Sequence, residues 1–408
     1  MSRRSLVIAI IAFIVLRGVL VWLAVSPERY SRPGFLPASD VGLYEGWASA
    51  VLRQNRAVYT DVPIEYPPGS IPFMLAPETV SGGHHYLAAF VTMSLLLDIA
   101  GLIGTIILAR RWRSSSGMWI WIVGVALLGP ITYLRLDIVP AVATIWAIER
   151  ASVGDSTTSG GWFGVGAIVK LYPALLIPIG IVTARRRTAF VAAAVGVVVA
   201  VLLPLVMDLG AVVHDVLGYH SARGIQVEST WGGVLFVAQR LGSDVAVVFN
   251  YGALHFAGAL ANKLKPVSEL LSAAAVVGVT TIVWFRRSRS PQLLAEAVFV
   301  LLALELALGS VFSPQYMVWI LALAATVGCI PSSSLRGLAW VVVAAAIPTQ
   351  SLFPFLYGGL LQADTFPLSV LLTRNLAILV VGVVGAWFLW SGRPSDPSTA
   401  EFASRGTP

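Results

Sequence analysis

The sequence contains few charged residues and almost no cysteine. Of its 408 residues only 12% are charged, five are histidines and one is a cysteine, whereas 57% are hydrophobic. A soluble domain of this length could not hide so much apolar surface in one core. With Cys329 as the single cysteine, an intramolecular disulfide and a cysteine-based metal site are both excluded. The composition therefore predicts an all-α polytopic membrane protein.

The arginines lie in clusters between apolar runs, which accounts for the net charge of +7 without a nucleic-acid partner. The clusters are at 3–4, 110–113, 185–187 and 286–289. Because basic residues flank spans on the cytoplasmic side, we expect both termini and the loop around Asp155 in the cytoplasm. Half of the carboxylates then fall in two large outer loops, 26–85 and 208–265. We expect a multi-pass plasma-membrane protein whose chemistry is extracytoplasmic.

The middle run 162–184 must leave and return between two arginine clusters, yet it is too short for two full spans. Pro173 disfavours helix at Tyr172 and has no backbone N–H to donate. We therefore expect two half-helices broken near Lys170, with irregular backbone lining a polar cavity. The Ser-, Thr- and Gly-rich stretch 149–160 is expected to be a cytoplasmic loop. The bundle then has about twelve membrane segments, half-helices included.

The apolar runs leave no room for a separate soluble domain, so we expect one membrane domain over 1–390. Within the second outer loop, 208–231 is expected to be irregular, 233–241 a short interfacial helix and 245–256 a small hairpin. The last stretch, 391–408, is rich in Pro, Ser and Thr and is expected to be a disordered cytoplasmic tail.

The first outer loop holds an acidic, aromatic-rich stretch that begins at Asp40. Residues 41–52 place apolar and aromatic side chains on one face of a helix, as in an amphipathic helix on the outer membrane surface. Asp40, or Ser39, is well suited to cap that helix. An aspartate held at the membrane surface is equally suited to act as general base on an acceptor hydroxyl. Both interpretations stay open from the sequence.

Charged residues inside apolar runs are costly and usually functional. Lys170, at the predicted break, is placed to hold a phosphate. Arg135 and Asp137 flank the outer start of another span, and Asp98, near mid-span, is expected to hydrogen-bond Lys170 or Arg135. Arg17 either has a role in the bundle or extends to the outer headgroups.

The second outer loop contains His214, Asp215, His220 and Glu228, which raises the question of a metal. Their spacing matches no metal-ligand signature, and neither outer loop contains Asp-x-Asp. We expect no cofactor and a metal-independent site, with a divalent cation as the alternative. Arg223, close to the membrane, is a candidate second phosphate ligand.

Several short motifs follow one another in a specific order. They are Asp40 with Leu43-Tyr44 and Trp47-Ala48, then Glu65 to Pro68, Lys170 to Pro173, Arg223 to Ser229, and Phe312 to Trp319. In this order they resemble the family 87 glycosyltransferases, which belong to the GT-C membrane glycosyltransferases and include actinobacterial mannosyltransferases and arabinofuranosyltransferases. The resemblance runs from Leu6 to about Trp390.

The resemblance implies a GT-C-type bundle that transfers a sugar from a polyprenyl-phosphate donor to a lipid or glycan acceptor on the outer face, with Asp40 as the base. The segment Ser313 to Tyr316 also resembles eukaryotic glycolipid mannosyltransferases, which favours mannose. Transfer of arabinofuranose is the alternative. A flippase or transporter of a lipid-linked sugar is an alternative of another class, but it would be expected to show repeated halves and short outer loops.

The expected site combines a base, a phosphate cradle and sugar contacts, so that direct attack opposite the leaving phosphate inverts the anomeric centre. Asp40 is the predicted catalytic base. The predicted donor-phosphate ligands are Lys170, Arg223 and Arg135. The predicted acceptor or sugar contacts are Tyr44, Glu65, Tyr66, Asp137, His220, Glu228, Gln315 and Tyr316. The donor, the acceptor and the bilayer are the expected partners.

Overall fold

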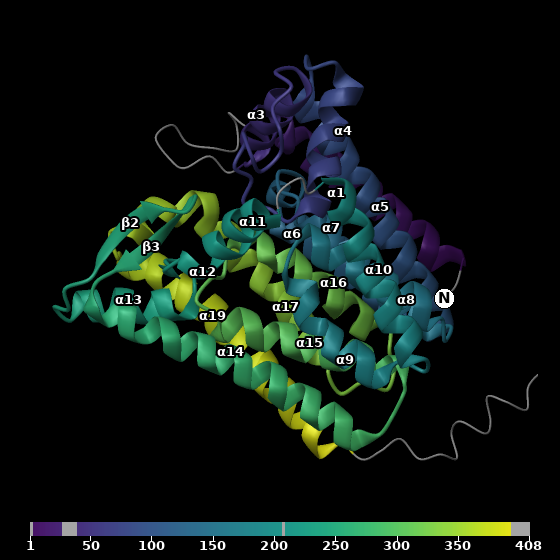
Figure 1. Ribbon diagram of the computed structural model, residues 1–408. Helices are drawn as coiled ribbons and strands as arrows, with labels where there is room; N and C mark the ends of the chain where they lie inside the picture. The colour runs from purple at the N-terminus through teal and green to yellow at the C-terminus, as the bar shows by residue number, and fades with distance from the viewer. Residues whose placement is uncertain (1–2, 27–38, 206–208, 393–408) are drawn as a thin grey trace, which may run out of the picture.

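The protein is mostly helical in a computed structural model, which describes residues 3–26, 39–205 and 209–392 (Figure 1). Among the described residues, six helical segments are long and apolar enough to cross a membrane, as expected of an integral membrane protein. They are α1 (Arg3–Ala24), α5 (Tyr86–Arg111), α14 (Ala259–Arg286), α15 (Pro291–Leu308), the stretch Arg336–Leu361 and α19 (Thr365–Ser391). That stretch consists of α17 (Arg336–Gln350), the π-helical segment η5 (Ser351–Leu356) and α18 (Tyr357–Leu361).

Shorter helices complete the bundle. They are α6 (Ser116–Leu128), α7 (Ile138–Ser152), α8 (Ser156–Val169), α9 (Tyr172–Thr183), α10 (Arg187–Leu205) and α16 (Met317–Gly328). Every residue of α16 is buried, so this helix forms the centre of the core. The number of membrane crossings and the single domain stay predictions. The predicted tail after Ser391 falls almost wholly on 393–408, outside the described residues, as do 27–38 of the first outer loop.

The predicted break between two half-helices is confirmed at Lys170 and Leu171, between α8 and α9. Lys170 has an extended backbone, and Pro173 lies in the first turn of α9, where its missing N–H removes no helical hydrogen bond. The predicted loop 149–160 is wrong. Only residues 153–155 separate α7 from α8, and the Asp155 side chain caps α8 by accepting the Thr158 N–H at 3.0 Å.

The small residues that suggested a loop instead let two helices pack closely. A Cβ atom at Gly160 would collide with the Phe190 carbonyl oxygen of α10. Glycine and serine are enriched where membrane helices approach each other at such short range. The composition of 149–160 was therefore a packing signal for α8 and α10.

The first outer loop forms α3 (Val41–Leu52), η1 (Pro68–Ser70) and α4 (Ile71–Ser81), which stand at one end of the bundle (Figure 1). Tyr44 and Ala48 bury the apolar face of α3, and the Tyr44 ring lies 5.5 Å from that of Phe90 on α5. The turn into η1 packs on the end of α8, because a Cβ at Gly69 would lie 2.8 Å from the Ile168 carbonyl oxygen. This contact places the first outer loop beside the helix break.

The second outer loop begins with α11 (Leu209–Val212), η3 (Val213–Gly218) and α12 (Tyr219–Ala222). It continues with β1 (Ile225–Gln226), α13 (Thr230–Arg240), β2 (Ala246–Asn250) and β3 (Ala253–Ala257). The hairpin of β2 and β3 and the short helix α13 were predicted and are confirmed. The prediction that 208–231 is irregular is wrong. Val212 and Val216 form a buried i, i+4 pair on a helix, and β1 pairs with β3.

Arg17 of α1 and Asp98 of α5 form an ion pair inside the bundle. Arg17 is 2% exposed and its Nε donates to Asp98 at 2.7 Å, while Trp121 and Tyr133 also donate to the same carboxylate. The predicted pairing of Asp98 with Lys170 or Arg135 is therefore wrong, and so is the extension of Arg17 to the headgroups. A buried charge is tolerated when an opposite charge and hydrogen bonds compensate it.

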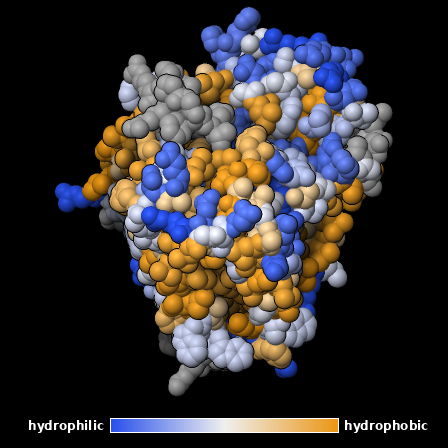
Figure 2. All heavy atoms as spheres, turned by 90° about the vertical axis from the view of Figure 1, so that its left-hand side faces the viewer, coloured by the Kyte–Doolittle hydropathy of each residue, from blue (hydrophilic) through white to orange (hydrophobic). Residues whose placement is uncertain are grey.

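Hydrophobic side chains cover most of the lower half of the molecular face in Figure 2, and hydrophilic ones gather at its upper end. The arginine-bearing ends of α5, α9 and α14 meet around one cavity at the end of the bundle away from α3. Gly154, in the loop between α7 and α8, lies beside Arg185 at that same end. This arrangement agrees with the positive-inside pattern, while the orientation in a membrane stays a prediction.

Cysteine labelling in intact cells tests the orientation. Gln54 and Val153 are both exposed, at opposite ends of the bundle, whereas the natural Cys329 is buried. We expect Gln54→Cys to react with a membrane-impermeant maleimide from outside and Val153→Cys to react only after the cells are opened. Labelling of Val153→Cys but not Gln54→Cys in intact cells would reverse the predicted topology.

Candidate active site

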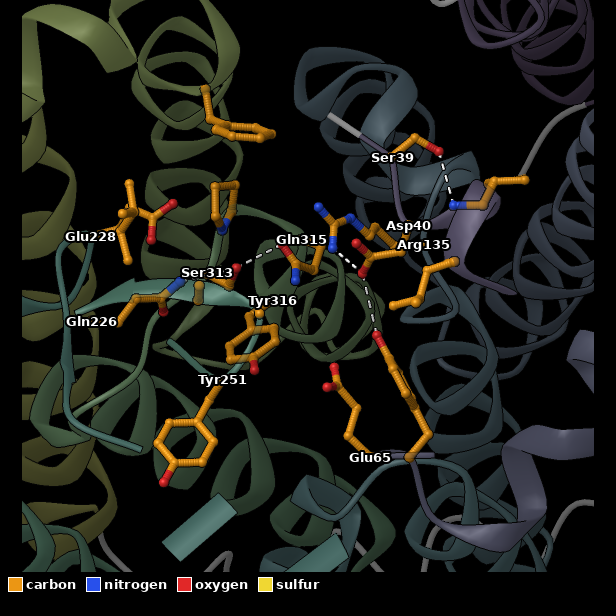
Figure 3. A pocket seen from close by; sticks show the side chains of 18 of the residues that line it. Ser39, Asp40, Glu65, Arg135, Gln226, Glu228, Tyr251, Ser313, Gln315 and Tyr316 are labelled. Carbon is orange, nitrogen blue, oxygen red and sulfur yellow. Dashed lines mark hydrogen bonds and ion pairs between the residues drawn. The ribbon is translucent and has the colours of Figure 1, made fainter. Parts of the chain in front are cut away.

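The elements at the α3 end of the bundle enclose a cavity of about 800 Å³. Its walls come from α3, the helix break after α8, the segment after α12, the hairpin turn and η4 (Pro314–Tyr316). Asp40 and Arg135 lie on one side of the cavity, and Gln226 and Glu228 lie on the other (Figure 3). A cavity of this size holds a sugar and a phosphate together.

The Asp40 carboxylate points into the cavity. It forms an ion pair with Arg135 and accepts hydrogen bonds from the hydroxyls of Tyr66 at 3.3 Å and Tyr44 at 3.4 Å (Figure 3). Asp40 makes no side-chain cap bond to α3; instead the Ser39 hydroxyl accepts the Val41 N–H at 3.0 Å. The capping role that the sequence left open therefore falls to Ser39, and the Asp40 carboxylate makes its contacts to side chains at the cavity instead of to the start of α3.

Lys170 and Arg223 bring positive charge to the same cavity. The Lys170 ammonium lies 3.6 Å from Asp137 Oδ1 and 4.4 Å from the centre of the Tyr66 ring. Within the described ranges of the chain, Arg223 forms no ion pair. Asp137 balances one of these two positive charges, and burial raises the pKa of the carboxyl group of Glu65, the acidic side chain beside them in the cavity, which favours its neutral form. The remaining positive charge suits an anion.

Arg135 follows the short helix η2 (Pro130–Tyr133), which connects the cavity to the buried ion pair below it. The Tyr133 hydroxyl donates to Asp98, and two residues later Arg135 pairs with Asp40. The Asp40 N–H also donates to the Leu134 carbonyl at 3.4 Å. Arg135 thus holds the predicted base in place, and its predicted phosphate contact stays a prediction.

An aromatic stack supports the break. The Trp319 ring lies between those of Tyr172 and Tyr316, with ring centres 4.1 Å and 3.9 Å apart. Tyr172 is the first residue of α9 and Tyr316 ends η4, so the stack fixes the half-helix to the cavity wall. Such contacts are typical of irregular backbone that is tolerated at membrane depth because protein surrounds it.

A row of amide and hydroxyl groups lines the wall opposite Asp40. The Ser313 hydroxyl donates to Gln315 Oε1 at 2.8 Å and accepts from Gln226 Nε2 at 3.4 Å. Gln226 Oε1 has no hydrogen-bond partner among the described residues although it is buried. Amides and hydroxyls in such a row suit the hydroxyls of a sugar. Gln226 and Ser313 were not among the predicted contacts, although both lie in the motifs that carried the resemblance.

Glu228 lies in the same wall and is held by its backbone. Its carbonyl oxygen accepts from Arg374 and from Asn375 Nδ2, and burial raises the pKa of its carboxyl group to about 7 although Arg374 is nearby. Near neutral pH this carboxyl group both donates and accepts hydrogen bonds, which suits a sugar hydroxyl. Arg374, a buried arginine inside α19, was missed, although a charge within an apolar run is a recognisable signal.

Two more titratable groups line the cavity with shifted pKa values. Burial, together with the positive charges of Lys170 and Arg223, lowers the pKa of His220 to about 4. Burial likewise raises the pKa of Glu65, against the opposing effect of those cations. At neutral pH His220 is a neutral hydrogen-bonding group, which fits the predicted sugar contact better than a phosphate contact.

All but two of the predicted site residues line this one cavity: Asp40, Glu65, Tyr66, Arg135, Lys170, His220, Arg223, Glu228, Gln315 and Tyr316. Tyr44 and Asp137 lie directly beneath, 0% and 1% exposed. His214 and Asp215 pair with each other away from it. Phe353 and Tyr357 also line the wall, without a sequence signal, because they come from an interrupted helix.

No group of three or more His, Cys, Asp or Glu side chains in the described ranges is arranged to hold a metal ion. The metal-independent site therefore stays a prediction. The cavity offers organic groups for each expected contact: a carboxylate, two cations and a row of hydrogen-bonding side chains.

The fold and the cavity together define a helical membrane protein. A polar pocket at one end of its bundle contains the Asp40 carboxylate and the two cations Lys170 and Arg223. Residues 65–314 match the profile of Glycosyltransferase family 87, and because this is more than half of the chain, the protein belongs to that family. The predicted family is confirmed. The matched range includes Lys170 and Arg223, whereas Asp40 precedes it.

Comparison with solved structures finds similarity to ArnT from Cupriavidus metallidurans, solved bound to undecaprenyl phosphate. The two chains share 14% sequence identity with a TM-score of 0.49, over 98% of this chain and 81% of the other. No curated protein sequence matches.

Proposed function

We propose that this glycosyltransferase transfers mannose from a polyprenyl-phosphate donor to a lipid or glycan acceptor on the extracytoplasmic face, with inversion and with Asp40 as the general base. One observation carries the proposal: the Asp40 carboxylate shares a single cavity with Lys170 and Arg223. A base and an anion cradle are the two parts that displacement of a phosphate by a hydroxyl requires.

In the proposed step the acceptor hydroxyl loses its proton to Asp40 as its oxygen bonds to the anomeric carbon. The bond between that carbon and the donor phosphate oxygen breaks, and the polyprenyl phosphate leaves with both electrons of that bond. Lys170 and Arg223 stabilise the negative charge that develops on the leaving phosphate. Because attack and departure occur on opposite faces, the anomeric configuration inverts.

The lipid tail of the donor supports a site at the membrane surface. The break at Lys170 puts an ammonium group between α8 and α9, which supports binding of the donor phosphate there. Donor and acceptor both held at the membrane have restricted translation, so positioning supplies part of the rate. The outer location follows from the predicted topology.

Mannose is supported by the resemblance of Ser313 to Tyr316 to the corresponding segment of glycolipid mannosyltransferases. Ser313, Gln315 and Tyr316 line the cavity, so in this proposal they contact the donor sugar. Buried amides and hydroxyls discriminate strongly between sugars, because a mismatched hydroxyl leaves one of them unpaired.

Turnover of defined donors tests this function. Purified protein in detergent, supplied with membrane lipid extract as acceptor, should consume polyprenyl-phosphate mannose and release polyprenyl phosphate in equal amount with a mannosylated product. Mass spectrometry identifies the product, and Asp40→Asn protein is the negative control. If the protein consumed polyprenyl-phosphate arabinose but not polyprenyl-phosphate mannose, the transferred sugar would be arabinofuranose and not mannose. Lipid-linked sugar movement across sealed vesicles without any turnover would instead indicate a flippase.

A further inference from the structure

Six arginines surround a second cavity, of about 1150 Å³, which we term the arginine cavity. They are Arg111, Arg113, Arg185, Arg286, Arg287 and Arg289. The helix α5 contributes Leu87 to the candidate active site and Arg111 to the arginine cavity. At a rise of about 1.5 Å per residue the two cavities lie about 36 Å apart along α5, close to the thickness of a bilayer.

The positive charge of the arginine cavity is not balanced by carboxylates. Glu296 is the one carboxylate that lines it among the described residues. Within the same part of the chain, Arg111 pairs with Glu149 at 2.9 Å, whereas Arg185 and Arg287 form no ion pair. The positive-inside rule explains why arginines lie at this end, but not why three separate helix ends direct them to one cavity.

Part of the cavity wall is apolar. Ile330, Leu335 and Leu389, which are buried, and Phe388, which is 38% exposed, line it beside the arginines. The ends of α14 and α19 lie side by side at its edge (Figure 1), joined by the bond from Arg286 to the Gly392 carbonyl. Large aromatic side chains are exposed on these two ends: Trp284, Phe285, Trp387 and Trp390. Exposed aromatic residues of this kind mark the headgroup level of a membrane.

We propose that the arginine cavity binds the phosphate headgroup of an anionic phospholipid from the leaflet at that end of the bundle. Arginine binds phosphate through two parallel hydrogen bonds, and basic pockets between membrane helices are suited to anionic headgroups. The serines at 288, 332 and 334 add hydroxyl groups to the same lining. Phe388 and the exposed aromatic side chains at the ends of α14 and α19 offer apolar contacts for the start of the acyl chains, which a free phosphate ion would not use.

Thermal unfolding of the full-length protein in neutral detergent tests the proposal. Dioleoyl phosphatidylglycerol should raise the Tm in a saturable manner, whereas dioleoyl phosphatidylcholine and inorganic phosphate at the same concentration should not. The double variant Arg185→Gln/Arg287→Gln should weaken the apparent Kd for phosphatidylglycerol about thirtyfold. Because both side chains are exposed and unpaired with carboxylates, the fold should be retained; Arg113→Gln/Arg287→Gln is a second variant with the same charge change.

The matched control is Arg110→Gln/Arg186→Gln. These arginines are exposed, adjoin Arg111 and Arg185 in sequence and do not line the cavity, so the lipid response should stay at the wild-type level. Equal weakening in the control would show diffuse charge attraction and overturn the site. Equal stabilisation by inorganic phosphate or by phosphatidylcholine would overturn the anionic lipid as its occupant.

Discussion

Replacing Asp40 by asparagine is expected to lower sugar transfer about a hundredfold to ten-thousandfold, because asparagine cannot accept the proton of the acceptor hydroxyl. The loss should fall mainly on turnover, and any loss of stability should come from Arg135, which loses its charged partner. Asparagine keeps the size of the side chain and still accepts from Tyr66, and α3 remains capped by Ser39. Initial rates with saturating donor, together with the Tm and donor affinity, measure these effects.

Two further variants separate catalysis from structure. Asp40→Ala removes both the partner of Arg135 and the acceptor of the Tyr66 hydroxyl, so it should lower stability more than Asp40→Asn, which keeps an acceptor for Tyr66. Asp61→Asn is the matched control, since Asp61 belongs to the same loop outside the cavity and its contact to the Ala57 N–H is one that asparagine can keep. A well-folded Asp40→Asn enzyme with near wild-type transfer would contradict the proposed base. Glu65, in the same cavity, would then be the next candidate.

Replacing Lys170 by alanine is expected to lower turnover of the lipid donor about a hundredfold to a thousandfold, as for loss of one preorganised group that stabilises developing negative charge. Lys170→Arg should lower turnover less than Lys170→Ala does, because the positive charge is kept. Turnover should still fall below the wild-type level, because the guanidinium group is larger and planar. The kcat and KM for the polyprenyl-phosphate donor are the quantities to measure.

The contact of Lys170 with Asp137 requires a compensating control. Removing the lysine alone leaves a buried carboxylate without its partner, which by itself destabilises the protein. The double variant Lys170→Ala/Asp137→Asn removes both charges. If Lys170 only neutralised Asp137, this variant would recover activity. If Lys170 holds the donor phosphate, the variant should recover stability but remain slow. Recovery of transfer would therefore make Lys170 a structural charge.

The candidate site was largely predictable because its residues lie in short motifs at the ends of apolar runs. Asp40, Lys170 and Arg223 are polar groups at places where the local pattern changes, and each belongs to a recognisable segment. Phe353 and Tyr357 were not predictable, since they reach the cavity only because the helix after α17 is interrupted.

The sequence by itself determined the membrane class, the family, the break at Lys170 and the hairpin of β2 and β3. These follow from composition and from patterns within a few neighbouring residues. Tertiary structure alone decided that Arg17 pairs with Asp98, that Arg374 holds the backbone of Glu228, and that the glycine-rich 149–160 is mainly helix. The reason is that a buried charge pairs with whichever opposite charge or carbonyl group the packing brings near. A small residue allows another helix to approach closely but does not specify which helix that is.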